Sequence, residues 1–351
     1  MERECLFSGK KVKVGVDSGY DNYIMAIESS CDETACAIVK NGREVVANIV
    51  ASQIKTHEKY GGVIPEIAAR EHMDAINIVI DEAFEQSGLK PEDITAFAGT
   101  VGPGLVGCLL VGLNATKTLA LVYDKPFIGV NHLNAHLCAN YIDTDLKPPF
   151  MALLISGGHT QIIDVESYSK QTILGETIDD AVGEAYDKVA RLIGLPYPGG
   201  PKLDKLAQIG NPNAYELPIS RVEGYNFSFS GLKTAVLRLV KRLKDENGND
   251  ALTESQVNDI CASFQECVSK TLAKKLKKAL QEKGYQQVVI AGGVAANSEI
   301  RRKIFEFENE GYSVYAPIMK YCTDNASMVA SCAYFNTNTF DDVDVEVFSR
   351  A

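Results

Sequence analysis

Two histidines four residues apart are the side chains in this sequence best placed to bind a metal ion. His132 and His136 lie in the segment NHLNAH, and this spacing on a helix puts both imidazoles on one face. Asp324, in the polar run YCTDNAS, is the best candidate for a third ligand. Two imidazoles and one carboxylate suit Fe(II), Zn or Mn and leave coordination positions for a substrate. The sequence therefore predicts an open metal site.

Two other interpretations of the histidine pair stay open. In a chain with five histidines, a pair at this spacing also arises by chance among surface or helix-capping residues. The spacing also matches a zinc-protease helix, in which a glutamate directly after the first histidine acts as the base. Leu133 stands at that position, so the protease chemistry lacks its base.

Four turns of small residues follow apolar segments. They are SSCDET (29–34), TVGPG (100–104), SGGHT (156–160) and AGGVAAN (291–297). Backbone N–H groups in such turns can bind phosphate, and glycine permits its close approach. None has the G-K-[ST] ending of a P-loop or the G-x-G-x-x-G pattern. Each alone is more often a plain tight turn, but four together favour a nucleotide or another phosphorylated ligand.

Two aspartates accompany glycines further along the chain. Asp187 lies in VGEAYDK and Asp204 in YPGGPKLD. Carboxylates near a nucleotide commonly accept hydrogen bonds from ribose hydroxyls, although exposed surface acids are the alternative.

Composition describes an ordinary globular protein of about two domains. The chain has 351 residues, 46% of them hydrophobic, and a net charge of −11. Because a net acidic protein repels nucleic acid, any such partner must meet a local basic surface. The best candidates are Lys233, Arg238, Lys241, Arg242 and Lys244, then Lys270, Lys274, Lys275, Lys277, Lys278 and Lys283.

Nine cysteines without a C-x-x-C pair indicate reduced thiols in a cytoplasmic protein. The longest uncharged stretch, 94–116, contains Pro103 and five glycines, so we expect no membrane span.

Segments with strand periodicity position these residues. YIMAIESS (23–30), ACAIV (35–39) and VVANIVASQ (45–53) are predicted strands joined by short turns. FMALLI (150–155), SGGHT and QIIDV (161–165) repeat the layout. The repeat predicts two related lobes facing a shared cleft, and two unrelated hairpins are the alternative.

Helical periodicity fills the remaining chain and indicates α/β architecture. PEIAAREHMDAINIVIDEAFEQSG (65–88) reads as an amphipathic helix ended by its glycine. We also expect helices at 232–244, 262–284 and near 325–335, with a long loop at 244–255.

Ten motifs occur in one order: IESSCDET, YGGVIPE, GPGLVG, HLNAH, LLISGGHTQ, DDAVGEAYDK, YPGGP, FSFSGLKT, AGGVAAN and CTDNASM. This ordered set closely resembles the bacterial TsaD family of tRNA threonylcarbamoyladenosine biosynthesis proteins, once labelled O-sialoglycoprotein endopeptidases. The resemblance covers the chain from about Tyr23 to about Tyr334 and is far more specific than any one motif. Residues 1–22 have no counterpart in the family, and Asn134 stands where many members carry Glu or Gly.

The resemblance implies a two-lobed actin/hexokinase-like (ASKHA) α/β fold, with duplicated RNase H-like domains and a central cleft. It implies transfer of threonylcarbamoyl from threonylcarbamoyl-AMP to the exocyclic amine of adenosine 37 in tRNAs that read codons beginning with A, with AMP released. The metal, usually iron, would be held by His132, His136 and Asp324. The adenylate would contact Leu154, Ile155, Ser156, Gly157, Gly158, Asp187, Gly200, Asp204 and Asn297. Partners would be a TsaB-like paralogue and a small TsaE-like ATPase.

The general base is open, and Asp32 and Glu33 in the first turn are the candidates. We expect a loosely ordered extension at 1–22, lobes at 23–147 and 148–340, and an acidic tail at 341–351. The C-terminal helix of the second lobe is expected to pack back toward the first.

Two other functions stay open. One is a phosphotransferase or ATPase of the same fold, which would turn over ATP alone. The other is a non-catalytic scaffold like the TsaB paralogue, which would not need the metal ligands.

Overall fold

The chain folds into two units, each built around a five-stranded sheet. The structure is a computed structural model that describes residues 1–220, 222–248 and 251–350. The first unit comprises Met1–Pro148, Ser167–Lys170 and Pro317–Ala351; the second comprises Pro149–Glu166 and Gln171–Ala316. The lobes expected at 23–147 and 148–340 stay a prediction.

The sheet of the first unit has the strand order β5-β4-β3-β6-β7. Its strands are β3 (Tyr23–Glu28), β4 (Glu33–Lys40), β5 (Glu44–Ser52), β6 (Ala96–Gly102) and β7 (Phe127–Asn131). The first three form the predicted antiparallel meander, while β6 runs parallel to β3 and β7 parallel to β6. Every residue of β6 is buried, because helices cover a sheet of this mixed kind on its faces.

The second sheet repeats this topology with the order β10-β9-β8-β11-β12. Its strands are β8 (Phe150–Ile155), β9 (Thr160–Ser167), β10 (Lys170–Glu176), β11 (Gln287–Ala291) and β12 (Ser313–Tyr315). As in the first sheet, the central strand β8 pairs antiparallel with its hairpin partner β9 and parallel with β11, and β11 pairs parallel with β12. The predicted duplication of strand–turn–strand layouts is confirmed.

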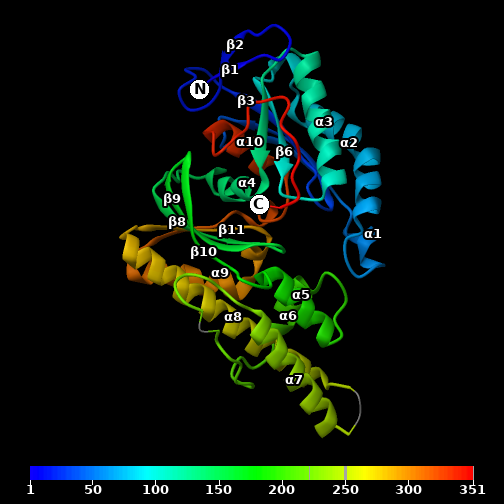
Figure 1. Ribbon diagram of the computed structural model, residues 1–351, viewed down its shortest axis with the longest axis vertical. Coiled ribbons are helices and arrows are strands. Elements are labelled where there is room, and N and C mark those ends of the chain that lie inside the picture. Colours follow the sequence, from blue (N-terminus) through cyan, green and yellow to red (C-terminus); the bar gives the residue numbers. More distant parts are fainter. Residues whose placement is uncertain (221, 249–250, 351) are drawn as a thin grey trace. The chain divides into compact units, whose positions relative to one another are not determined.

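Helices of the first unit pack on both faces of its sheet (Figure 1). They are α1 (Ile54–Glu58), α2 (Pro65–Ser87), α3 (Val106–Val122), α4 (His132–Cys138) and α10 (Ala326–Phe335), with the 3₁₀ turns η1 (Pro91–Asp93), η2 (Ala139–Tyr141) and η5 (Met319–Tyr321). The predicted helix end at Gly88 is confirmed: this residue has φ 67° and caps α2. Within the described ranges, no helix is long and apolar enough to cross a membrane.

Helices of the second unit include the long α8 (Figure 1). They are α5 (Val182–Leu192), α6 (Gly199–Ala207), α7 (Ser230–Glu246), α8 (Glu254–Lys283) and α9 (Ser298–Phe305), with the 3₁₀ turns η3 (Gly293–Ala296) and η4 (Glu306–Glu310). Helix α8 begins well before the predicted residue 262. The cause is a capping box, in which the Thr253 hydroxyl accepts from the Gln256 N–H (3.2 Å) and the Gln256 side chain accepts from the Thr253 N–H (2.9 Å). Residues 249–250 of the predicted loop lie outside the described residues.

Residues 1–22, expected to be a loose extension, contain an antiparallel hairpin of β1 (Glu2–Glu4) and β2 (Lys11–Lys13). The buried Arg3 forms an ion pair with Asp341 and donates to Asn336 Oδ1 (2.6 Å) and Thr339 Oγ1 (3.0 Å). These bonds hold the hairpin against the C-terminal residues of the same unit. Of the acidic tail expected at 341–351, Ala351 lies outside the described residues.

Candidate functional site

Helix α4 begins at one candidate metal ligand and carries the second one turn later. The Asn131 side chain caps the helix by accepting hydrogen bonds from the N–H groups of Leu133 (2.9 Å) and Asn134 (3.2 Å). This cap starts the helix at His132, at the end of β7. The rings of His132 and His136 consequently lie edge to face, with centroids 4.6 Å apart.

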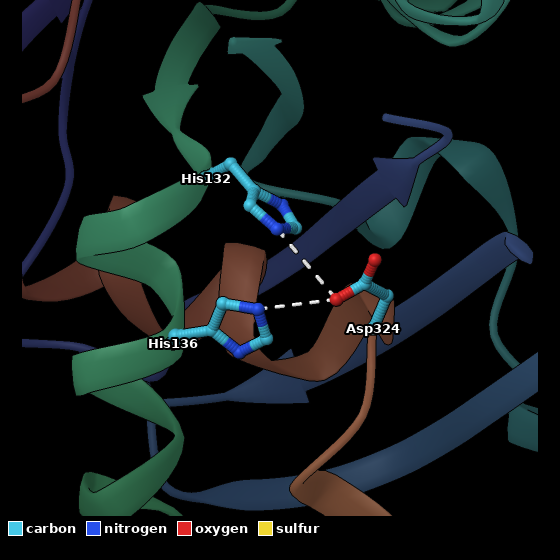
Figure 2. A group of neighbouring side chains, drawn as sticks. All are labelled: His132, His136 and Asp324. Carbon is cyan, nitrogen blue, oxygen red and sulfur yellow. Dashed lines mark ion pairs between the residues drawn. The ribbon is translucent and has the colours of Figure 1, made fainter. Parts of the chain in front are cut away.

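The third candidate ligand, Asp324, comes from the loop before α10. Its neighbour Asn325 caps α10 by accepting from the Met328 N–H (3.1 Å), and α10 packs against α4. Asp324 Oδ1 therefore lies 3.1 Å from His136 Nε2 and 3.6 Å from His132 Nε2 (Figure 2). One ligand atom from each residue lies within 4.8 Å of the others. The structure brings the three predicted ligands together, and the group could hold a metal ion.

A buried carboxylate that sequence reasoning missed lies behind His132. Glu28, at the end of β3, accepts from the Thr100 hydroxyl (2.6 Å) and the Ser30 N–H (2.6 Å), and its Oε2 lies 3.1 Å from His132 Nδ1. This contact turns the Nε2 atom of the same ring toward Asp324. The signal in the sequence was a charged residue ending the apolar run YIMAI.

Neighbouring charges favour the ionised forms of Asp324 and His132. Burial favours a neutral Asp324, but the two imidazoles outweigh it and lower the pKa of this carboxyl to about 2. Burial also opposes charge on His132, yet the Asp324 and Glu28 carboxylates raise the pKa of its imidazole to about 9. An ionised carboxylate and two imidazoles are a ligand set that fits a divalent cation.

Of the two candidate bases, Asp32 lies in the turn between β3 and β4, and Glu33 is the first residue of β4. Burial, followed by the charges of Asp324 and Asp32, raises the pKa of Glu33 to about 10. A carboxyl group with that pKa is neutral at pH 7 and donates a proton more readily than it accepts one. The Asp32 carbonyl accepts from the Gln53 N–H (2.9 Å), which fixes the turn. The catalytic role of both residues stays a prediction.

The glycine turn after β8 exposes backbone donors. The buried end of that strand supplies two candidates, Leu154 and Ile155. Ser156 closes the turn by donating its N–H to the His159 carbonyl (2.8 Å) and accepting from the His159 N–H at its hydroxyl (3.1 Å). Between them, Gly157 and Gly158 are exposed, and within the described part of the chain their N–H groups have no hydrogen-bond partner. Such a turn can bind phosphate.

Asp187 and Gly200 are brought together at the start of α6. The Asp187 carboxylate on α5 accepts from the N–H groups of Gly199 (2.9 Å) and Gly200 (3.1 Å). Its burial raises the pKa of this carboxyl above the ordinary value. The carboxylate thus satisfies two donors at a helix N-terminus through Oδ1.

Asp204 and Asn297 are linked through a residue that the sequence did not single out. The Gln265 side chain on α8 donates to Asp204 Oδ1 (2.9 Å) and accepts from the Asn297 amide (2.8 Å). Asp204 also accepts from the Ser298 hydroxyl (2.6 Å). A glutamine within the apolar run ASFQECV is the available signal, because a buried amide needs polar partners.

The comparisons with known proteins agree on the family. A profile described as TsaD, tRNA N6-adenosine threonylcarbamoyltransferase, matches residues 44–331. A protein of that name from Clostridioides difficile (strain 630) is 50% identical over 322 residues, which are 90% of this chain and 93% of the relative. One from Clostridium perfringens (strain SM101 / Type A) is 52% identical over 316 residues, 89% of this chain and 92% of the relative.

Two solved structures share the fold at low sequence identity. Full-length HypF is 15% identical with a TM-score of 0.60, covering 93% of this chain and 47% of HypF. Component A of the (R)-2-hydroxyglutaryl-CoA dehydratase of Acidaminococcus fermentans is 18% identical with a TM-score of 0.53, covering 91% of this chain and all of that chain (100%).

The repeated sheets and the two-histidine, one-carboxylate group define a two-domain, ASKHA-like α/β protein with a site suited to a metal. Within this class, the profile match and the relatives show that the chain belongs to the TsaD family and is a tRNA N6-adenosine threonylcarbamoyltransferase.

Proposed function

We propose that the chain takes the threonylcarbamoyl group from threonylcarbamoyl-AMP and transfers it to the exocyclic amine of adenosine 37, in tRNAs that read codons beginning with A. The approach of Asp324 to both histidines of α4 is the observation that carries this proposal. A non-catalytic subunit has no use for an ionised carboxylate and two imidazoles converging on one point. The family match over residues 44–331 supports the substrate class.

The proposed cofactor is one divalent metal ion held by His132, His136 and Asp324, with Fe(II) favoured over Zn or Mn. When bound, such an ion supplies Lewis-acid polarisation of a carbonyl or phosphoryl oxygen. Three protein ligands leave positions open for the substrate. Glu28 supports the assignment, because metal-binding histidines usually direct their second nitrogen at a carboxylate or a carbonyl.

The remaining residues have proposed roles in holding and reacting the substrate. The N–H groups of Gly157 and Gly158 bind the AMP phosphate, while Asp187 and Asp204 accept from ribose hydroxyls. Leu154, Ile155, Ser156, Gly200 and Asn297 complete the proposed adenylate contacts. The adenine amine bonds to the carbamoyl carbon, the bond from that carbon to the phosphate oxygen breaks, and AMP leaves. The amine proton passes to Asp32 or Glu33 as the base.

Two proteins are the proposed partners, a TsaB-like paralogue and a TsaE-like ATPase. The proposed compartment is the cytoplasm, which agrees with nine cysteines that are all free thiols in this structure.

Reconstitution tests the function. The chain is combined with both partners, labelled threonylcarbamoyl-AMP and unmodified tRNA, and digested tRNA is analysed for threonylcarbamoyl-adenosine. We expect label in adenosine 37 only when this chain is present. ATP turnover by the chain alone without labelled tRNA would instead identify a phosphotransferase, and labelling in its absence would identify a scaffold.

Replacing Glu28 by glutamine tests the metal assignment through the residue that contacts His132 Nδ1. Glutamine keeps the size of the side chain but loses the charge that fixes His132 Nδ1. We expect metal affinity to fall roughly 10- to 100-fold, the usual effect of losing an outer hydrogen-bond partner. Titration of the apo protein with Fe(II) or Zn(II) measures it. Ser29→Ala is the matched control, since its hydroxyl donates to the Cys108 carbonyl in the same buried region. Equal affinities in both variants would remove Glu28 from the site.

A further inference from the structure

The lysines of α8 differ in how far their charge is already neutralised. Lys270 is paired with Glu266 (2.9 Å), Lys277 with Glu310 (2.6 Å) and Lys283 with Asp164 (2.6 Å). The other three, Lys274, Lys275 and Lys278, are less closely paired with carboxylates. The basic run of the sequence therefore contains two sets of lysines, one with close carboxylate partners and one for which the described residues provide none within 3 Å.

The second set faces little neutralising charge. Lys275 donates to the carbonyls of Val222 (2.9 Å) and Gly224 (3.1 Å), which carry no formal charge. Lys278 reaches Glu282 only at 3.8 Å, with both side chains about half exposed, and Lys274 has no ion pair within the residues that the structure describes. Burial, together with the neighbouring Lys278 and Lys274, lowers the pKa of Lys275. Three cations thus repel one another at one place and favour an anionic ligand.

All three of these lysines line one groove of about 890 Å³. Its opposite wall comes from the segment before α7, with Leu217, Ile219 and Val222 as apolar contributors and Glu216 as an acidic one. Ile219 is 49% exposed. The groove therefore combines cations on one wall with apolar surface on the other, as a binding site for a nucleic-acid strand does.

We propose that this groove of the second unit binds the sugar–phosphate backbone of the tRNA substrate. The proposal rests on the proposed function, because it takes the polyanion to be the tRNA that this chain modifies. A chain of net charge −11 repels tRNA as a whole and must hold it by a local group of cations. Lys274 and Lys278 lie one helical turn apart, about 6 Å along the axis, a spacing that suits neighbouring phosphates of one strand.

The same helix connects the groove to the proposed adenylate contacts. Gln265, which bonds to Asp204 and Asn297, lies nine residues before Lys274 on α8. At 1.5 Å per residue this separation is about 14 Å. A rigid helix can therefore hold the tRNA backbone at a fixed distance from the residues proposed to hold the donor. This arrangement favours a nucleic acid over an acidic protein segment as the occupant.

The test compares two double variants of equal charge in the complex with both partner proteins. Lys274→Gln with Lys278→Gln removes two groove cations, and Lys270→Gln with Lys277→Gln removes two that are already paired. For the groove variant we expect weaker tRNA binding and a log–log salt dependence flatter by about 2 units, close to 0.9 for each lost phosphate contact. Its KM for tRNA should rise while kcat and threonylcarbamoyl-AMP binding stay unchanged. The paired-lysine variant should keep the wild-type slope.

Each other outcome overturns the proposal in an identifiable way. Equal salt slopes in the two variants, with the wild-type complex active, would show that tRNA binds elsewhere and would leave the proposed function standing. Loss of the partner proteins from the groove variant, with tRNA affinity retained, would make an acidic protein the occupant. A wild-type complex that neither binds nor modifies tRNA would overturn the proposed function itself. Circular dichroism of the single variant Lys274→Gln, at an exposed position, checks that the helix is intact.

Discussion

His136→Ala is expected to remove bound metal and threonylcarbamoyl transfer together. The substitution deletes the ligand closest to Asp324, at 3.1 Å, and leaves only two of the three donors. We expect transfer to fall by more than the roughly 10- to 100-fold that follows the loss of an outer partner. Metal content by mass spectrometry and label transfer to tRNA measure the two effects.

Folding needs a separate check, because the His136 side chain is almost completely buried (1% exposed). Alanine leaves a cavity there, which costs up to a few kcal/mol of unfolding free energy. His136→Leu fills much of that volume and still removes the ligand. His57→Ala is the matched control, since His57 is equally buried in the same unit and bonds to Gln53. Full metal occupancy in His136→Leu, or equal metal loss in His57→Ala, would contradict the assignment.

Gly157→Val is expected to weaken adenylate binding by about 10- to 100-fold with little change in thermal stability. A Cβ at this position meets nothing within 4 Å in the protein, so the folded chain accommodates the side chain. It would stand where the phosphate approaches the exposed N–H groups. A hydrogen bond to a charged group is worth about 1.5–3 kcal/mol, and each 1.4 kcal/mol is a factor of ten in affinity. Calorimetric titration with a stable adenylate analogue and thermal unfolding are the two measurements.

Gly183→Ala is the comparison variant, because it strains the backbone of the same turn from inside the protein. Its Cβ would lie 2.7 Å from the Ser156 carbonyl oxygen and 2.8 Å from Gly157 Cα, both backbone atoms. We therefore expect it to lower the melting temperature. If Gly157→Val lost stability and affinity in equal measure, the turn would be a structural turn and no ligand site.

The sequence predicts the candidate metal ligands better than their surroundings. The spacing of His132 and His136 is a local property of one helix, so it can be read from the chain. Asp324 was identifiable from the polar run YCTDNAS after a predicted strand. Glu28 and Gln265 were missed, because each is defined by partners far away in sequence and looks like an ordinary polar residue beside apolar ones.

Element type was likewise more predictable than element ends and charge pairing. The strands of both sheets follow apolar runs and short turns, which are local signals. Helix α8 begins well before the predicted residue 262, because the capping box at Thr253 starts it there. Sorting the α8 lysines required Glu310 and Asp164, which come from other elements. Ion pairs between residues far apart in the chain leave no local pattern in the sequence.

The first unit is interrupted in the chain by the whole second unit, and it is completed only by Pro317–Ala351. During synthesis on the ribosome, both histidines emerge before the second unit, and Asp324 emerges only after it. Proteins generally fold domain by domain as they are made, yet the proposed metal site lacks its carboxylate until the second unit has been synthesised. A nascent chain that ends within the second unit thus presents two imidazoles without the proposed third ligand. Metal binding by all three proposed ligands therefore requires that the second unit has been synthesised.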